Sequence, residues 1–299
     1  MTPAGLPPAA VSASVRAADG IRIHYLTWAA ARPRAVLLLS HGLGEHAGRY
    51  APFAAILAAR GITVAAPDHR GHGRSGGQRG HVDRFARFAE DFEAVRAAAT
   101  PPGDLPVFVL GHSLGGLIVI RWMQAHREAG VRGVILSAPL LGVALKAPAW
   151  KLAMSGALSR WLPRVPFTSG VDPEKLSSDA AYIRSYHDDP LVHGRVTPRL
   201  YTELMAATEA AFAGCSALRE PPILVLVPGD DQIVDAAAVT RFAESLPGEV
   251  AVRHYPRMRH EVLNEADRAL PIGDVLAWIE EKIGPLTETQ RHGEKNLEG

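Results

Sequence analysis

One serine of the chain lies between two glycines, directly after an apolar segment. Residues 106–120 read PVFVLGHSLGGLIVI, in which Gly111, Ser113 and Gly115 form the pattern G-x-S-x-G. The pattern lies between a strand-like run and a helix-like run, where a tight turn strains the serine and requires small neighbours. The following helix would point free N–H groups and the positive end of its dipole at the serine. We therefore expect Ser113 to be a nucleophile.

A serine hydroxyl needs a base to take its proton and an acid to orient that base. In hydrolases with this turn, the chain order is serine, then acid, then histidine. Asp231 follows an apolar run at 223–227, and His260 follows another at 250–254. We predict Asp231 as the acid and His260 as the base, with the adjacent Asp230 as the alternative acid.

Three other groups of residues have alternative interpretations. Asp235 precedes an alanine-rich helical pattern and is expected to cap it. His260-Glu261 begins like the zinc motif H-E-x-x-H, but position 264 is Asn, so the second ligand is missing. Side chains that could ligate a metal also occur near residue 70, namely Asp68, His69, His72 and His81. Arginines and glycines lie between them, which is typical of a structural loop. We expect neither a metal nor any cofactor.

A glycine-rich loop near the N-terminus raises a different possibility. Residues 35–50 read AVLLLSHGLGEHAGRY, and 42–47 fit the G-x-G-x-x-G/A spacing of a dinucleotide-binding turn. With Asp68 at a plausible strand end, this spacing permits a dinucleotide-dependent oxidoreductase. That hypothesis leaves Ser113, Asp231 and His260 without a role, so we keep it as a distant alternative.

The chain alternates short apolar runs with helical patterns. This alternation predicts an α/β fold with a mostly parallel central sheet covered by helices on both faces. Residues 21–28 alternate like an antiparallel edge strand. Buried strands are expected at 35–39, 62–66, 106–110, 133–136, 223–227 and 250–254, and helices at about 51–60, 83–99, 115–128, 236–245 and 269–283.

The alternation is interrupted once. Residues 140–213 contain helix-compatible pieces broken by prolines and no clear strand, which predicts a helical cap above the carboxyl ends of the strands. The core is expected to comprise 1–139 and 214–285, with a loose leader over the first twenty residues. The polar tail at 286–299 has no periodicity and is predicted to be disordered.

Composition narrows the function classes. The 299 residues carry a net charge of +1 and no long Lys/Arg stripe, which argues against a nucleic-acid partner. Cys215 is the only cysteine, so no intrachain disulfide forms and a cytoplasmic location is the default expectation. The sequence makes no prediction of oligomeric state.

Several motifs together resemble the monoacylglycerol lipase and lysophospholipase group of α/β-hydrolases. The resemblance spans roughly residues 20–285. HG-x-G-E-H followed by RGHG-x-S is much more particular than GHSLGG, which many hydrolases share. The stretches are HGLGEHAGRY (41–50), DHRGHGRS (68–75), RGHVDRF (79–85), GHSLGG (111–116), YHDDPLV (186–192), DQIV (231–234) and RHEV (259–262).

This resemblance implies an α/β-hydrolase fold and roles for further residues. By similarity, Ser113, Asp231 and His260 correspond to the catalytic triad. The oxyanion hole would be formed by the backbone amides of Leu43 and Leu114. Contacts to the glycerol head group would fall on Glu45, Arg49 and His112. For Glu45 and Arg49, an i,i+4 ion pair at a helix start is the alternative. Leu263 stands where some members carry a histidine near the alcohol-binding end.

A stripe of large apolar residues lies within the expected cap. Trp150, Met154, Leu158 and Trp161 are spaced as one face of a helix. Packing of the cap onto the core would explain the stripe. Alternatively, it borders an acyl-chain tunnel, or makes transient contact with a membrane or lipid aggregate.

We therefore predict a serine carboxylic-ester hydrolase that cleaves monoacylglycerols, a small-molecule lipid ester substrate, to fatty acid and glycerol through an acyl-enzyme. A lysophospholipase, a broad short-chain carboxylesterase and an aminopeptidase-like amidase remain alternatives on the same scaffold.

Overall fold

A central sheet of eight strands organises the protein, in the order β1-β2-β4-β3-β5-β6-β9-β10. The computed structural model describes residues 10–100, 103–126, 130–144 and 156–284. Strands β3 to β6, β9 and β10 run parallel, and β1 and β2 are antiparallel to their neighbours. The strands are β1 (Val11–Arg16), β2 (Arg22–Trp28), β3 (Ala35–Ser40), β4 (Ile62–Pro67), β5 (Val107–His112), β6 (Gly133–Ser137), β9 (Ile223–Pro228) and β10 (Val250–Tyr255).

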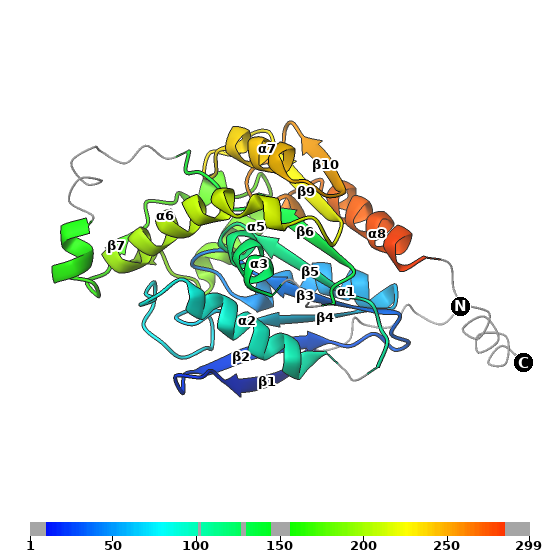
Figure 1. Ribbon diagram of the computed structural model, residues 1–299, viewed down its shortest axis with the longest axis horizontal. Helices are drawn as coiled ribbons and strands as arrows, with labels where there is room; N and C mark the ends of the chain where they lie inside the picture. The colour runs from blue at the N-terminus through cyan, green and yellow to red at the C-terminus, as the bar shows by residue number, and fades with distance from the viewer. Residues whose placement is uncertain (1–9, 101–102, 127–129, 145–155, 285–299) are drawn as a thin grey trace, which may run out of the picture.

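Helices cover both faces of this sheet (Figure 1). One apolar core lies between the sheet and helices α1 (Ala51–Ala59) and α8 (Ala269–Ile283). The other lies between the opposite face and α2 (Ala86–Ala99), α3 (Leu114–Ala125) and α7 (Ala236–Ser245). Every residue of β3, β4, β5 and β9 is buried, which explains their nearly continuous apolar sequences. The predicted α/β-hydrolase fold is confirmed.

The edge of the sheet differs from the expectation. Residues 1–20 were expected to form a loose leader and 21–28 the edge strand. Instead Val11–Arg16 pairs with β2 and becomes the edge. VSASVR is half polar and largely exposed, because an edge strand with one solvated face needs little apolar content. Such a short alternation is hard to distinguish from a loop in sequence.

The segment after β6 lies over the carboxyl ends of the strands (Figure 1). Backbone hydrogen bonds fix it there, among them those from His193 N to Gly44 O, Thr197 N to Gly80 O, and Glu261 N to Leu176 O. The expectation that this segment contains no strands was wrong in one detail, because β7 and β8 form a short antiparallel pair. Each strand has two residues, which is too short to show an alternating pattern in the sequence. The elements are β7 (Phe167–Thr168), η2 (Pro173–Lys175), α5 (Ala180–Asp188), β8 (Arg195–Val196) and α6 (Pro198–Ala213), with a helical turn at 156–161.

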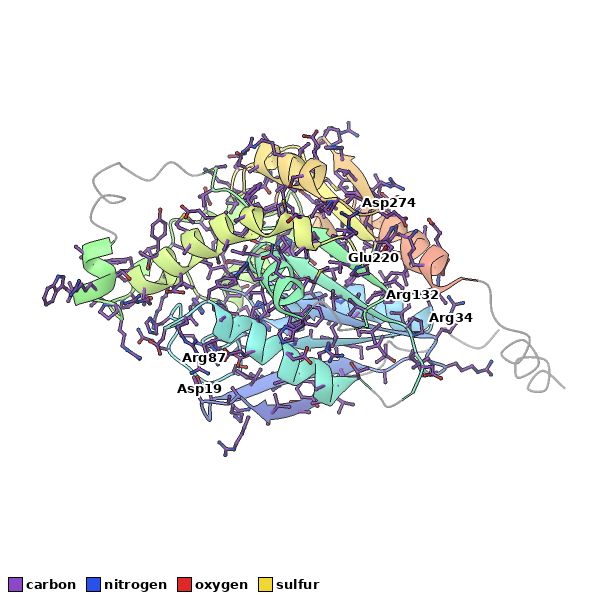
Figure 2. The ribbon with its side chains drawn as sticks, in the orientation of Figure 1. Asp19, Arg34, Arg87, Arg132, Glu220 and Asp274 are labelled. Carbon is purple, nitrogen blue, oxygen red and sulfur yellow. The ribbon has the colours of Figure 1, made fainter. Side chains whose placement is uncertain are left out.

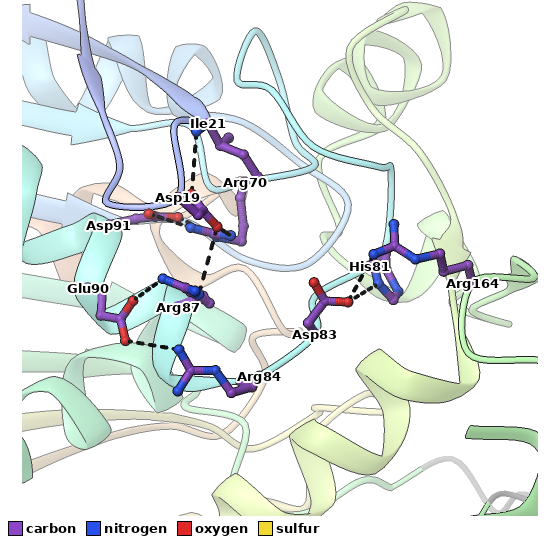
Figure 3. Close-up of polar contacts among 10 residues, drawn as sticks. All are labelled: Asp19, Ile21, Arg70, His81, Asp83, Arg84, Arg87, Glu90, Asp91 and Arg164. Carbon is purple, nitrogen blue, oxygen red and sulfur yellow. Dashed lines mark hydrogen bonds and ion pairs between the residues drawn. The ribbon is translucent and has the colours of Figure 1, made fainter. Parts of the chain in front are cut away.

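Buried and exposed ion pairs hold the loop between β4 and α2, on which part of this cap rests. Arg70 donates to Asp91 at 2.6 and 2.7 Å and to Asp19 at 2.8 Å (Figure 3). Further along, Asp83 Oδ1 lies 3.0 Å from His81 and 3.2 Å from Arg164 of the cap. The buried pairs therefore order the loop, and the outer ones connect it to the cap.

The opposite end of the sheet carries a different set of charged residues. Arg34, Arg132 and Glu220, which come shortly before β3, β6 and β9, gather at the end away from the cap (Figure 2). None of the helices that the structure describes is long and apolar enough to cross a membrane.

Candidate active site

Ser113 lies at the turn between β5 and α3 with a left-handed backbone, φ 53° and ψ −118°. Only a tightly packed site tolerates this conformation in a residue with a side chain. Glycines surround it because there is no room for more: a Cβ on Gly115 would lie 2.0 Å from Ser40 O, and one on Gly111 would lie 2.4 Å from Gly115 O. The Ser113 hydroxyl makes no hydrogen bond to any described residue. It is therefore free to react.

His260 and Asp231 form a buried pair beyond the ends of β10 and β9. His260 Nδ1 lies 2.8 Å from Asp231 Oδ2, so Nδ1–H donates and Nε2 is left as the basic atom. The other carboxylate oxygen accepts from Ile233 N at 2.8 Å and Val234 N at 2.9 Å. The side chain of Asp230 is instead 53% exposed, with Arg259 Nε 4.0 Å away. The geometry thus places Asp231, not Asp230, beside the histidine.

Two opposing effects act on the His260 imidazole. Burial disfavours the charged ring, but the charge and hydrogen bond of Asp231, with the charges of Glu261 and Glu45, outweigh it and raise the pKa of His260. The adjacent His112 ring lies 4.8 Å from that of His260. Burial and the His260 charge hold the pKa of His112 well below its ordinary value, so His112 stays neutral.

The loop after β3 approaches Ser113 closely. A Cβ on Gly42 would lie 3.4 Å from Ser113 Cβ, and Leu43 is the next residue of this loop. Among the described residues, neither Leu43 N–H nor Leu114 N–H donates a hydrogen bond. Free backbone amides are what the oxyanion-hole role predicted for Leu43 and Leu114 requires.

Glu45 and Arg49 lie in the same loop and η1 (Ala47–Tyr50), both buried and with their charged atoms 3.8 Å apart. Glu45 Oε1 accepts from Gly42 N at 2.5 Å and Tyr50 OH at 2.8 Å. In contrast, Glu45 Oε2 and Arg49 Nη2 are buried without a hydrogen-bond partner in the described structure. The pair therefore presents one free acceptor and one free donor.

The charge state of Glu45 is sensitive to its surroundings. Burial and the nearby charge of Glu261 raise the pKa of Glu45 to about 7, although Arg49, Gly42 N–H and Tyr50 oppose the shift. Glu45 is thus a carboxyl group that titrates near neutral pH.

Three residues at this end of the site were not predicted from the sequence. The Arg49 guanidinium lies 4.4 Å from the ring centre of Tyr182 and 4.6 Å from that of Tyr186, both on α5. The Tyr182 hydroxyl donates to Glu261, which directly follows His260. Tyr186 lies within the motif YHDDPLV, and Glu261 belongs to the His260-Glu261 pair. Both motifs can be seen in the sequence, but neither of them indicates a contact with Arg49 or Tyr182.

A cleft of about 410 Å³ opens beside this cluster. Its walls come from η1, the start of α1, α5 and the segment at 264–268 that precedes α8, and Arg49 is part of its lining. The charged and polar residues among its lining include Arg49, Asp179, Tyr182, Asp189, Asn264 and Arg268.

The apolar stripe of the cap is only partly visible. Leu158 is half-buried on the turn at 156–161, and Trp161 is 77% exposed. Trp150 and Met154 lie outside the described residues. Elsewhere, Asp68 accepts hydrogen bonds from His24, Ala47 N and Arg74 N. In the part of the chain that is described, no three histidine, cysteine or acidic side chains are placed to hold a metal ion.

Comparisons with known proteins agree with this geometry. A monoacylglycerol lipase of Mycolicibacterium smegmatis is 35% identical over 87% of this chain and 93% of its own. Phospholipase YtpA of Bacillus subtilis is 34% identical over 81% and 93% of the two chains. The crystal structure of Paleococcus ferrophilus monoacylglycerol lipase superposes with a TM-score of 0.79 at 28% identity, over 87% of this chain and 99% of that one. The family model described as serine aminopeptidase, S33, matches residues 31–267. The chain therefore belongs to this serine hydrolase family of the α/β-hydrolase fold.

Proposed function

We propose that the protein hydrolyses monoacylglycerols to fatty acid and glycerol, with Ser113, His260 and Asp231 as its catalytic triad. One observation carries this proposal. The buried His260–Asp231 hydrogen bond lies beyond the carboxyl ends of the strands, as does the strained turn that holds Ser113. The two relatives named as monoacylglycerol lipases support the choice of substrate.

In this mechanism Ser113 Oγ attacks the ester carbonyl while His260 Nε2 takes its proton. Asp231 holds the ring in the Nδ1–H tautomer and stabilises the imidazolium. The amides of Leu43 and Leu114 stabilise the oxyanion, and loss of one such donor costs about 3–4 kcal/mol of barrier. Collapse breaks the ester C–O bond, and the glycerol oxygen leaves with the proton from His260.

A water molecule completes the cycle. His260 Nε2 removes its proton as it attacks the acyl-enzyme carbonyl, and collapse of the second tetrahedral intermediate releases the fatty acid and returns the proton to Ser113. Each step uses only the substrate, water, and side chains and backbone amides of this chain.

The head group would be held by Glu45 and Arg49. Their unpartnered Oε2 and Nη2 atoms offer an acceptor and a donor to glycerol hydroxyls. The neutral His112 packs against His260 and completes this end of the site. A polyol would satisfy both buried atoms without bringing a charge.

A hydrolysis panel tests the proposal. It compares 1-monoacylglycerols of graded chain length with diacylglycerol, lysophosphatidylcholine, short-chain esters and an aminoacyl amide. We expect the highest kcat/KM for a monoacylglycerol, and loss of activity in Ser113→Ala. Preference for lysophosphatidylcholine would favour the second candidate, a lysophospholipase, which the relative named phospholipase YtpA supports. Amide preference would overturn the ester assignment.

The cap presents an apolar surface that suits contact with lipid. Trp161, Leu162, Val165 and Phe167 are 77%, 49%, 44% and 46% exposed, and Arg160 and Arg164 lie beside them in sequence. Exposed aromatic and aliphatic side chains with neighbouring arginines suit an anionic lipid surface. We include transient membrane contact through this surface in the proposed function. The cytoplasmic location expected from the single cysteine also remains a prediction.

Two variants separate lipid contact from acyl-chain binding. Trp161→Ser should weaken flotation with anionic vesicles while leaving hydrolysis of monomeric butyrate esters unchanged. Leu158→Asp should lower kcat/KM for long-chain esters far more than for butyrate esters if the stripe borders an acyl tunnel. Equal losses on both ester classes would contradict the tunnel, for which Trp150 and Met154 remain predicted lining residues.

A further inference from the structure

Glu261 is a buried carboxylate that the triad chemistry does not use. It directly follows His260, and it is 4% exposed. Its Oε2 accepts hydrogen bonds from Tyr182 OH and from Asn264 Nδ2, the latter at 2.9 Å. A side chain held this way has a fixed position beside the reacting end of the site.

Tyr182 connects Glu261 to the head-group arginine. Arg49 Nε donates to Tyr182 OH at 3.2 Å, and that hydroxyl donates onward to Glu261. On its other side Arg49 faces Glu45, 3.8 Å away. One guanidinium is thus shared between two carboxylates, which leaves little of its positive charge for a ligand.

The charges further out do not correct this imbalance. Arg268 is paired with Asp179 at 3.0 Å, and His46 with Asp189 at 2.8 Å. The described charged residues that line the cleft are Asp179, Asp189, Arg49 and Arg268, with His46 beside Asp189. Because Arg268 and His46 are paired with these two aspartates, Arg49 alone faces Glu45 and Glu261 behind the cleft, and the excess of negative charge lies on that pair.

We propose that Glu261 is a specificity-determining residue that keeps phosphate-bearing head groups out of the site and so favours uncharged polyol esters. This inference rests on the proposed monoacylglycerol hydrolysis and deepens it. A phosphate brings one to two negative charges into a buried space beside two carboxylates, and both repulsion and desolvation oppose its binding. A glycerol hydroxyl meets neither penalty and can still use the free Glu45 Oε2 and Arg49 Nη2.

The test compares two substrates that differ only by a phosphate, 1-octanoylglycerol and 1-octanoylglycerol 3-phosphate, both below their critical micelle concentrations. Glu261→Gln keeps an oxygen for Tyr182 and Asn264 but removes the charge. We expect it to raise the ratio of kcat/KM for the phosphate ester to kcat/KM for the neutral ester by about tenfold. Because the variant shifts His260 equally for both substrates, the ratio isolates the effect on the head group. Glu244→Gln, the same charge change at an exposed position of α7, should leave the ratio unchanged.

The unaltered protein gives a second measurement that does not depend on the variant folding. It should cleave the neutral ester at least tenfold more efficiently than the phosphate ester, with the gap narrowing as ionic strength rises. An unchanged ratio in folded Glu261→Gln, or equal rates for both esters in the unaltered protein, would overturn the role of Glu261. Failure of the unaltered protein to cleave 1-octanoylglycerol at all would instead overturn the proposed function.

Discussion

His260 Nδ1 and Asp231 Oδ2 lie 2.8 Å apart, although 29 residues separate them in the chain. The pair is almost fully buried, and Asp231 is itself held by two backbone N–H groups. Asp231→Asn would keep the shape but allow the amide to orient the ring in the wrong tautomer. We expect kcat to fall by roughly 10³- to 10⁴-fold, measured by steady-state ester hydrolysis.

Asp230→Asn is the matched control for this change. Its carboxylate is 53% exposed and lies 4.0 Å from Arg259. The substitution should therefore change kcat less than threefold and the free energy of unfolding by less than about 0.5 kcal/mol. A larger loss in Asp230→Asn than in Asp231→Asn would reverse the assignment of the acid.

The pH dependence of hydrolysis should report the state of His260. The ring must be neutral to accept the Ser113 proton, and its pKa is raised above the ordinary value of 6.5. Activity should thus be present above the raised pKa and be lost as the pH falls through it. A profile of kcat/KM against pH should show an acid limb centred above 6.5. A limb centred below 6.5 would contradict net stabilisation of the imidazolium by Asp231.

Gly44 couples the loop beside Ser113 to the cap. Its φ is +82°, and a Cβ there would lie 2.3 Å from His193 O, while its own carbonyl accepts from His193 N at 2.8 Å. Gly44→Ala should lower the free energy of unfolding by about 3 kcal/mol, since both backbone strain and overlap oppose it. The displaced Leu43 amide should also lower kcat by at least tenfold.

Gly20→Ala separates strain from overlap. Gly20 has nearly the same φ, +83°, but nothing lies within 4 Å of an added Cβ. We expect about 1 kcal/mol of destabilisation from strain alone, with kcat unchanged. Chemical denaturation and ester hydrolysis measure both quantities, and equal effects of the two alanine variants would count against cap contact at Gly44.

The ion pairs in Figure 3 differ in depth and should differ in energetic value. Asp91→Ala would leave Arg70 buried with Asp19 as its one remaining acidic partner among the described residues, and should lower the free energy of unfolding by about 3 kcal/mol. Glu90→Ala removes an exposed partner of Arg87 and should cost less than about 1 kcal/mol. Urea denaturation compares them, and similar losses would show that burial of the Arg70 pair does not decide its contribution.

Local chemistry made much of the site visible in the sequence. The turn around Ser113 can be recognised in the sequence because it requires glycine on both sides of the serine. At Gly111 and Gly115, a Cβ atom would overlap with nearby backbone atoms. The fully buried parallel strands were equally clear, because both of their faces must be apolar. The weak strand β1 was missed, since its half-polar alternation carries no such requirement.

Contacts between distant segments could not be obtained from the sequence. Asp230 and Asp231 are neighbours of the same chemical type, and only the path of the chain after β9 directs one of them to His260. Likewise, His46 meets Asp189 across 143 residues, and Tyr182 meets both Arg49 and Glu261. The sequence by itself determined the nucleophile turn, the alternation of buried strands and helices in the core, and the candidate acids and base. Only the tertiary structure decided which carboxylate pairs with His260 and how many share Arg49, because such pairings depend on where the sheet brings the loop ends together.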